Sequence, residues 1–417
     1  MKKRLLIVLG LFIITISSIL TGCNDETAAG PGENDSFIKL LGSENNQIAN
    51  DMICETDGSI FILSTSEIEE EIGFSYKLKI SKLDAFGNLL WDVSYPEGLF
   101  ADTQLSCKGS SITSLADGYL IIGESINANN QSLLLVLKID ANGSILASKE
   151  LAQNGGATPI RGIDVAINSN NEIKAIAQIE SASNNIWIGT LSNDNSFTLD
   201  SACTFQYSSS GTNLQILKDT YIENSDEIVY GMGVIRSGRE NGSLVKVPSC
   251  QSLPITGPLI SSTQSTASYN VNQLGTSLNG YTLVGTTDFN GDEDIFLARV
   301  DKSGVLQDTE PLIYGELNGV VLDGNDEGLA IMQTGDGGFL IGGATESNSA
   351  GENDILLIKT DFNGNVSWTQ QYGDENNDRP LVLKQAPDGG YLILANSDFG
   401  GIQSLLLIKT DKTGNVN

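Results

Sequence analysis

Histidine is absent from the 417 residues, and basic side chains are scarce. Lys and Arg number 23 against 52 Asp and Glu, which gives a formal net charge of −29. Without imidazole there is no His general base, Ser-His-Asp triad or His-ligated metal site. A surface this acidic repels phosphate backbones, so nucleic-acid binding is not expected. Apolar residues make up 40% of the chain, which is enough for a folded core.

The longest apolar run, Leu5 to Leu20, follows Met1-Lys2-Lys3-Arg4 and is shorter than the ~20 residues of a membrane-spanning helix. This pattern predicts a secretory signal over residues 1–22. The tetrad that ends in Cys23 resembles the bacterial lipobox. The resemblance implies cleavage before Cys23, diacylglycerol on its thiol and a palmitate-type chain on the new amino terminus. An uncleaved anchor or an ordinary secretory peptide is the alternative.

Residues 23–35 are polar and lack apolar periodicity, which predicts a flexible tether. The acidic residues just after Cys23 are similar to the surface-export signals of Bacteroidota lipoproteins. We therefore expect a lipid anchor in the cell envelope, most simply the outer membrane of a Gram-negative bacterium. Whether the protein faces the periplasm or the surface stays open. Removal of the signal takes away three basic residues and lowers the net charge to about −32.

The remainder of the chain repeats itself. Asp336-Gly337-Gly338-Phe339-Leu340-Ile341 is echoed by Asp388-Gly389-Gly390-Tyr391-Leu392-Ile393. Related turns precede them at Asp57-Gly58, Asp117-Gly118, Asn170-Asn171, Asp226-Glu227 and Asn279-Gly280. Seven turns between positions 57 and 388 give a mean period of about 55 residues, in the range of β-propeller blades.

Each repeat predicts four short antiparallel strands, because turn residues separate apolar runs that lack a helical period. The expected fold is all-β, a seven-bladed β-propeller over residues 36–417. The expected blades lie near residues 47–98, 99–153, 154–209, 210–262, 263–316, 317–374 and 375–417. Residues 36–42 align with the outer strand after Asn365, so we expect this N-terminal strand to complete the last blade and close the propeller.

Three recurring positions predict how blades meet. The second strand carries a small residue at Ser64, Gly123, Ala177, Gly285, Gly343 and Ala395. We expect these small residues to let neighbouring sheets approach. Trp91 and Trp368 follow glycine turns and are expected to dock between blades. A basic residue recurs near the end of the third strand at Lys82, Lys138, Lys246, Arg299, Lys359 and Lys409, where we expect surface pairs with Asp or Glu.

The repeats, from Asp-Gly-Gly-Tyr-Leu-Ile at residues 388–393 to Leu-Ile-Lys-Thr-Asp at 407–411, resemble those of uncharacterised Bacteroidota lipoproteins with a propeller-like pattern. The resemblance covers residues 36–417 and is weakest over the third and fourth repeats. It implies the fold and a cell-envelope location, and it brings no catalytic residues with it.

One loop places oxygen side chains at alternate positions, as calcium loops do: Asp288, Asn290, Asp292 and Asp294. Glu293 stands where an EF-hand loop needs glycine, so an ordinary solvated hairpin loop is the alternative. No other cofactor is expected.

With Cys23 committed to lipid, four cysteines remain. Their separations are close to one repeat, which predicts disulfides Cys54–Cys107 and Cys203–Cys250 in an oxidising compartment, with four free thiols as the alternative.

These patterns predict a lipid-anchored module that binds or scaffolds a protein or glycan at one rim, and not an enzyme. The acidic segment Glu67-Ile68-Glu69-Glu70-Glu71 and the divergent third and fourth repeats are the expected rims. The alternatives are a carboxylate-based polysaccharide hydrolase or lyase with channel-facing Asp and Glu, and a scaffold of the outer-membrane-assembly type.

Overall fold

The computed structural model describes residues 35–42, 45–70, 74–95, 104–127, 129–180, 185–206, 214–216, 221–223, 227–236, 239–248, 254–256, 258, 260, 267–317 and 319–417. The chain divides into two units, Met1–Gly30 and Pro31–Asn417, and all described residues belong to the second. The predicted signal over residues 1–22 and the tether up to residue 34 lie outside the described residues. In the described part, no helix has the length and apolar character needed to cross a membrane.

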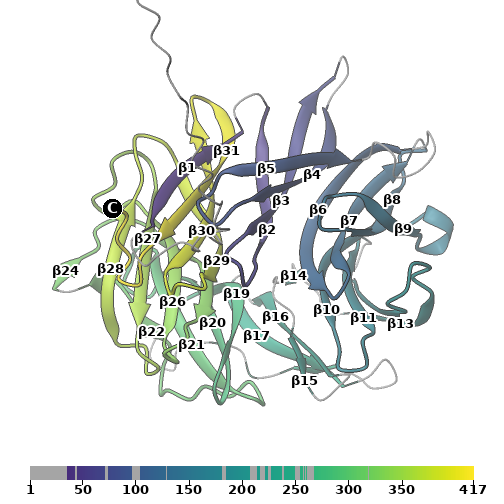
Figure 1. Cartoon of the computed structure of the whole chain (residues 1–417). Coiled ribbons are helices and arrows are strands. Elements are labelled where there is room, and N and C mark those ends of the chain that lie inside the picture. The colour runs from purple at the N-terminus through teal and green to yellow at the C-terminus, as the bar shows by residue number, and fades with distance from the viewer. Residues whose placement is uncertain are drawn as a thin grey trace, which may run out of the picture. The chain divides into compact units, whose positions relative to one another are not determined.

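Six sheets of the described chain are four-stranded antiparallel blades (Figure 1). Three blades come from the first half of the chain. The first consists of β2 (Gln47–Cys54), β3 (Ile60–Glu69), β4 (Phe74–Leu83) and β5 (Leu89–Tyr95), and the second of β6 (Gln104–Leu115), β7 (Gly118–Asn127), β8 (Ser132–Ile139) and β9 (Ile145–Leu151). The third consists of β10 (Ile160–Ile167), β11 (Ile173–Ile179), β12 (Asn185–Leu191) and β13 (Leu199–Gln206). A further blade consists of β19 (Tyr269–Ser277), β20 (Gly280–Thr287), β21 (Asp294–Asp301) and β22 (Leu312–Ile313), and the next of β25 (Asp326–Gln333), β26 (Phe339–Thr345), β27 (Asp354–Thr360) and β28 (Val366–Tyr372). The last blade combines β29 (Asp378–Gln385), β30 (Tyr391–Phe399) and β31 (Ile402–Thr410) with the N-terminal strand β1 (Phe37–Leu41).

The prediction of seven blades is wrong, because the segment expected to form the fourth blade, near residues 210–262, forms a different sheet. Its five strands are β14 (Leu214–Ile216), β15 (Tyr221–Glu223), β16 (Glu227–Arg236), β17 (Arg239–Val247) and β18 (Ile255–Thr256). Two three-residue strands, β14 and β15, both pair with β16 in place of one inner strand, and β18 is two residues long. Pro254 and Pro258, on either side of β18, lack the N–H that a longer outer strand would donate to the ladder.

Two small elements complete the described structure. A 3₁₀ turn, η1 (Asn154–Gly156), precedes β10. The strands β23 (Glu316–Leu317) and β24 (Val320–Val321) form a two-stranded ribbon between β22 and β25.

An Asp-x-x-Gly turn links the third and fourth strands of most blades. In the turn after β27, Asp361 Oδ1 accepts hydrogen bonds from the backbone N–H groups of Asn363 (2.8 Å) and Asn365 (2.9 Å). Gly364 takes a φ of 84°, a left-handed conformation that suits glycine. The same turn recurs at Asp84, Asp140, Asp301 and Asp411.

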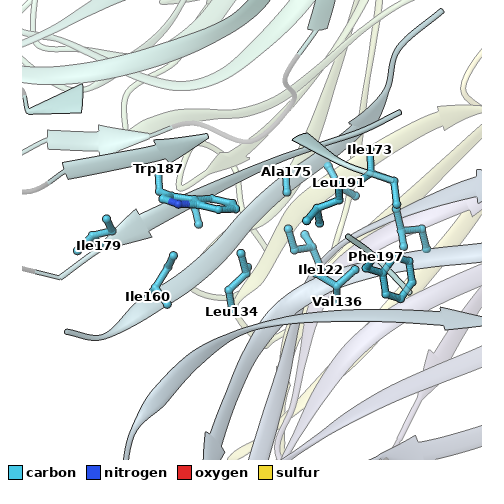
Figure 2. Packing of buried hydrophobic residues seen from close by; sticks show 13 residues of the cluster. Ile122, Leu134, Val136, Ile160, Ile173, Ala175, Ile179, Trp187, Leu191 and Phe197 are labelled. Carbon is cyan, nitrogen blue, oxygen red and sulfur yellow. The ribbon is translucent and has the colours of Figure 1, made fainter. Parts of the chain in front are cut away.

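The third strand of most blades is apolar on both faces, because each face packs on a different neighbour; β4, with Lys77 and Lys79 on one face, is the exception. In β8, Leu135 and Leu137 pack against the β2–β5 blade. Leu134 and Val136, on the opposite face, pack with Trp187 of the β10–β13 blade (Figure 2). Comparable clusters join each sheet to the next, and one joins the β29–β31 sheet back to the β2–β5 blade. The series of sheets therefore closes on itself.

Small residues and aromatic side chains set the approach between blades, as predicted. A Cβ on Gly162 would lie 2.9 Å from the backbone nitrogen of Gly123 in the preceding blade. On the outer strand β5, Tyr95 donates a hydrogen bond of 2.6 Å to the Gly143 carbonyl, and Tyr314, directly after β22, donates one of 2.9 Å to the Gly364 carbonyl. Trp91 lies against Gly143, which confirms the docking role expected for it.

Five of the six repeated basic residues form ion pairs in the described structure, but the prediction that these pairs lie at the surface is wrong for several. Lys138 is only 3% exposed and contacts Asp117 at 2.8 Å, and Lys359 is 4% exposed and contacts Asp336 at 2.9 Å. Each lysine reaches from the third strand to the Asp of the turn before the second strand. The pair therefore holds a turn against its own sheet.

The N-terminal strand completes the last blade, as the repeat alignment predicted. β1 pairs antiparallel with β31, from Phe37 opposite Lys409 to Leu41 opposite Leu405. Phe37 also packs against Gly87 of the β2–β5 blade, and Lys39 Nζ donates to Asn88 Oδ1 at 2.9 Å. The strand thus joins the last blade to the first through side chains as well as backbone.

We predict that Phe37→Ala lowers the free energy of unfolding by about 1–2 kcal/mol, because the ring loses its packing on the neighbouring blade. Chemical denaturation measures the change. The control is Ile38→Ala on the same strand, whose side chain is 53% exposed and should matter little. Equal effects of the two substitutions would contradict the packing role of β1.

Candidate functional site

The cysteines do not form the first predicted disulfide. Cys54 and Cys107 are both free thiols, and Cys107 is buried in the core between the first two blades. The predicted Cys54–Cys107 bond is therefore wrong. Burial raises the pKa of the free Cys54 thiol to about 11. Cys203 is disulfide-bonded. Its predicted partner Cys250 and the lipidation residue Cys23 lie outside the described residues, so those two assignments stay predictions.

The predicted calcium loop uses its polar side chains on protein partners. Asp288 Oδ1 accepts a hydrogen bond of 2.7 Å from the Ser268 backbone N–H, and the Asn290 amide donates to Asp294 Oδ2 at 2.6 Å. Asp294 is 1% exposed. Across the described ranges, no group of three or more acidic or cysteine side chains is placed to hold a metal ion. The geometry therefore does not support the predicted calcium site, which also included Asp292.

A buried carboxyl group lies next to this loop. Asp326, the first residue of β25, is fully buried, and its backbone N–H donates to the Glu293 carbonyl at 2.7 Å. Burial raises the pKa of Asp326 to about 6. The hydroxyls of Thr345 and Ser347 partly offset this increase, and the negative charge of Asp294 adds to it.

Carboxylates of the inner strands hold neighbouring blades together. Asp51 Oδ2 accepts the Ile112 backbone N–H at 3.0 Å, and Asp164 Oδ1 accepts the Ser111 hydroxyl at 2.7 Å. Each bond crosses from one blade to the next. A cavity of about 220 Å³ between the inner strands β2, β19, β25 and β29 is lined by glutamines, apolar side chains, Lys384 and Asp51.

A second cavity has a different character. Three blades meet around a cleft of about 290 Å³, which we call the hairpin cleft because the β3–β4 hairpin forms one wall. It is lined by Ile48, Asn50, Thr65, Glu67, Tyr76, Lys108, Gly109, Ser110, Glu124 and Arg161. Two acidic and two basic side chains lie here, in a chain where acids outnumber bases by more than two to one.

The walls of the hairpin cleft contact each other through polar groups. Glu67 and Tyr76 are directly opposite each other on β3 and β4, and the Tyr76 hydroxyl lies 3.3 Å from Glu67 Oε1. From the next blade, Lys108 places its ammonium 3.7 Å from the centre of the Tyr76 ring. Burial raises the pKa of Tyr76, and the negative charge of Glu67 adds a smaller increase.

Bonds outside the cleft orient its remaining charged groups. Glu124, opposite Lys108 in the same blade, accepts the Ser132 hydroxyl at 2.5 Å. Arg161 pairs with Glu180 at 2.7 Å. The cleft can therefore offer hydrogen-bond acceptors from two carboxylates and donors from an ammonium and a guanidinium at once.

The acidic segment Glu67–Glu71 is an expected binding rim, and its first residue lines this cleft. Glu67 and Glu69 belong to a strand rather than to a loop, and the binding role stays a prediction. Tyr76, Lys108, Glu124 and Arg161 carried no signal of their own, because they lie on four different strands that only the packing of three blades brings together.

The chain matches no protein-family model and no curated protein sequence. Among solved structures it is similar to extracellular domains 1–2 of Drosophila semaphorin 1a, with a TM-score of 0.50, 9% identity, and 89% of this chain and 88% of that chain covered. It is also similar to the β-propeller domain of the trilobed protease from Pyrococcus furiosus (TM-score 0.49, 9% identity, 89% and 97% covered). A protein of unknown function from Dyadobacter fermentans is a further match (TM-score 0.45, 10% identity, 89% and 97% covered). At these identities the similarity concerns the fold alone.

We predict that Asp326→Asn stabilises the protein by about 1–3 kcal/mol at pH 7.5. The folded-state pKa of about 6 lies above the ordinary value of 3.8, so the folded state binds the proton more tightly than the unfolded state. Stability should therefore fall as pH rises from about 4 to 6, and the variant should show a smaller decline, because burial also raises the pKa values of Asp294 and Asp378.

Denaturation curves at several pH values measure this effect. Asp398→Asn, at an exposed position, is the control and should keep the decline. A variant of Asp326 that is less stable than the parent protein at pH 7.5 would contradict the prediction.

Proposed function

We propose that this protein is a lipid-anchored binding module of the cell envelope and that a glycan occupies its hairpin cleft. The observation that carries the proposal is the balanced set of charged groups around Tyr76. Sugar hydroxyls both donate and accept hydrogen bonds, so a site for them needs acceptors such as Glu67 and Glu124 beside donors such as Lys108 and Arg161.

The position of the cleft supports the proposal. It lies where three blades meet, and ligand sites commonly form where several structural elements converge on a rigid scaffold. Its main wall is the β3–β4 hairpin, in which Leu63, Leu78 and Ile80 are buried in the core between two blades. The polar side chains of the wall are therefore attached to a backbone that packing holds in place.

We do not extend the proposal to hydrolysis. The inner-strand carboxylates Asp51 and Asp164 are engaged by backbone and hydroxyl donors of neighbouring strands, which suits a structural role.

The envelope location rests on the lipobox-like tetrad at Cys23 and on the resemblance of the repeats to Bacteroidota lipoproteins. Two or three acyl chains would give stable anchoring, whereas one chain gives marginal binding.

Binding to an array of neutral and acidic glycans tests the ligand. We expect at least one neutral glycan to bind the parent protein and Glu67→Gln to weaken that binding about tenfold, because a charged hydrogen-bond acceptor in the cleft is lost. Glu70→Gln is the matched control, since it removes the same charge from the same hairpin but from a residue that does not line the cleft. Equal weakening by the two variants, or no bound glycan, would overturn the proposal.

Palmitate labelling in a Gram-negative host tests the anchor. We expect the parent protein to carry label and to sediment with membranes, and Cys23→Ser to lose both properties because it lacks the acceptor thiol. Cys54→Ser should retain them. Membrane-bound, labelled Cys23→Ser protein is the outcome that excludes this anchor.

A further inference from the structure

The β3–β4 hairpin extends the wall of the hairpin cleft outward. Its face toward the β6–β9 blade carries cross-strand pairs at every second position, in the order Leu63–Ile80, Thr65–Leu78, Glu67–Tyr76 and Glu69–Phe74. Side chains two apart on a strand share one face, so these four pairs form one continuous strip.

Burial decreases steadily along this strip. Leu63 and Ile80 are fully buried in the core between the two blades. The Glu67–Tyr76 pair lines the cleft and is partly buried. The last pair lies in the open, and the Phe74 side chain is 59% exposed. An aromatic ring therefore stands uncovered directly beyond the cleft, on the same face as Tyr76.

The last two pairs have the same composition, a carboxylate beside an aromatic ring. Tyr76 and Phe74 are two residues apart on one strand, which places them about 6.8 Å apart along it. The outer pair can offer the Phe74 ring face to the apolar face of a sugar and the Glu69 carboxylate to its hydroxyls. In the inner pair the Lys108 ammonium lies over one face of the Tyr76 ring, so this pair offers mainly its carboxylate, with that ammonium beside it.

Charge selects among the partners that could cover the ring. Glu69 and Glu70 lie at the outer end of this hairpin, and its lysines, Lys77, Lys79 and Lys82, lie further in along β4. The chain as a whole has a net charge of −29. A ligand with carboxylate or sulfate groups along its length would meet repulsion at the outer pair. A neutral, hydroxyl-rich chain meets none.

We propose that the hairpin is a two-subsite platform for a neutral oligosaccharide, which runs from the cleft outward along the strip. One sugar contacts the Glu67–Tyr76 pair, and the next contacts the Glu69–Phe74 pair. This inference rests on the proposed glycan-binding function and adds to it the ligand class, the direction of the chain and the second subsite.

The test uses neutral oligosaccharide series of one to six sugar units, first on an array and then by calorimetry with the series that binds best. For the parent protein we expect affinity to rise about tenfold when the chain becomes long enough to reach Phe74, because part of an aromatic ring is removed from water. Phe74→Ala should abolish this rise and leave the affinity of the shortest ligand unchanged. Phe74→Tyr should restore it.

Two controls separate the subsites from general effects. Phe86→Ala removes an exposed ring, 42% exposed, from the turn between β4 and β5 and should leave the length dependence intact. Glu67→Gln should weaken ligands of every length.

The outcomes distinguish the two levels of the proposal. If Phe74→Ala keeps the length dependence, or if only acidic glycans bind, the outer subsite is wrong while glycan binding in the cleft stands. If no glycan binds and a protein partner protects the hairpin instead, both proposals are wrong.

Discussion

The structure depends on the burial of sheets that are apolar on both faces. Strands such as β8, β27 and β31 place alternate side chains into two different clusters, one on each side of the sheet. A single sheet cannot bury both faces, so every blade needs two neighbours and the series has to close. The backbone pairing of β1 with β31, and the packing of Phe37 on the first blade, provide that closure.

The same packing decides where the few basic residues act. Lys138 and Lys359 are nearly buried, and each holds the turn that begins the second strand of its blade. Removing one partner of such a pair would leave an uncompensated charge in a poorly solvated place. Lys108 and Arg161 instead line a cleft with Glu67 and Glu124. The hairpin cleft is thus a place where the acidic excess of the chain is locally cancelled.

Much of the fold could be predicted from the sequence, because repeated turns, apolar strands and the outer-strand alignment are local signals. The strand at Phe37–Leu41 and the docking of Trp91 followed from them. The number of blades could not be predicted from these signals, because the segment near Asp226-Glu227 has only degenerate turns. There the inner strand is replaced by β14 and β15, which both pair with β16. The repeat length predicts where a divergent repeat lies in the chain. It does not predict which strands pair within that repeat, because the pairing depends on side chains that differ from those of the other repeats.

The sequence by itself determined the class of fold, the position of the closing strand and the absence of imidazole chemistry, because each of these follows from composition or from order along the chain. Tertiary structure alone decided that Cys54 and Cys107 stay unpaired and that Asp294 is buried beside Asn290. It also decided that Tyr76, Lys108 and Arg161 share a cleft. Residues from three blades meet there only because both faces of every blade must be buried, and the sequence shows that requirement without showing which side chains it brings together.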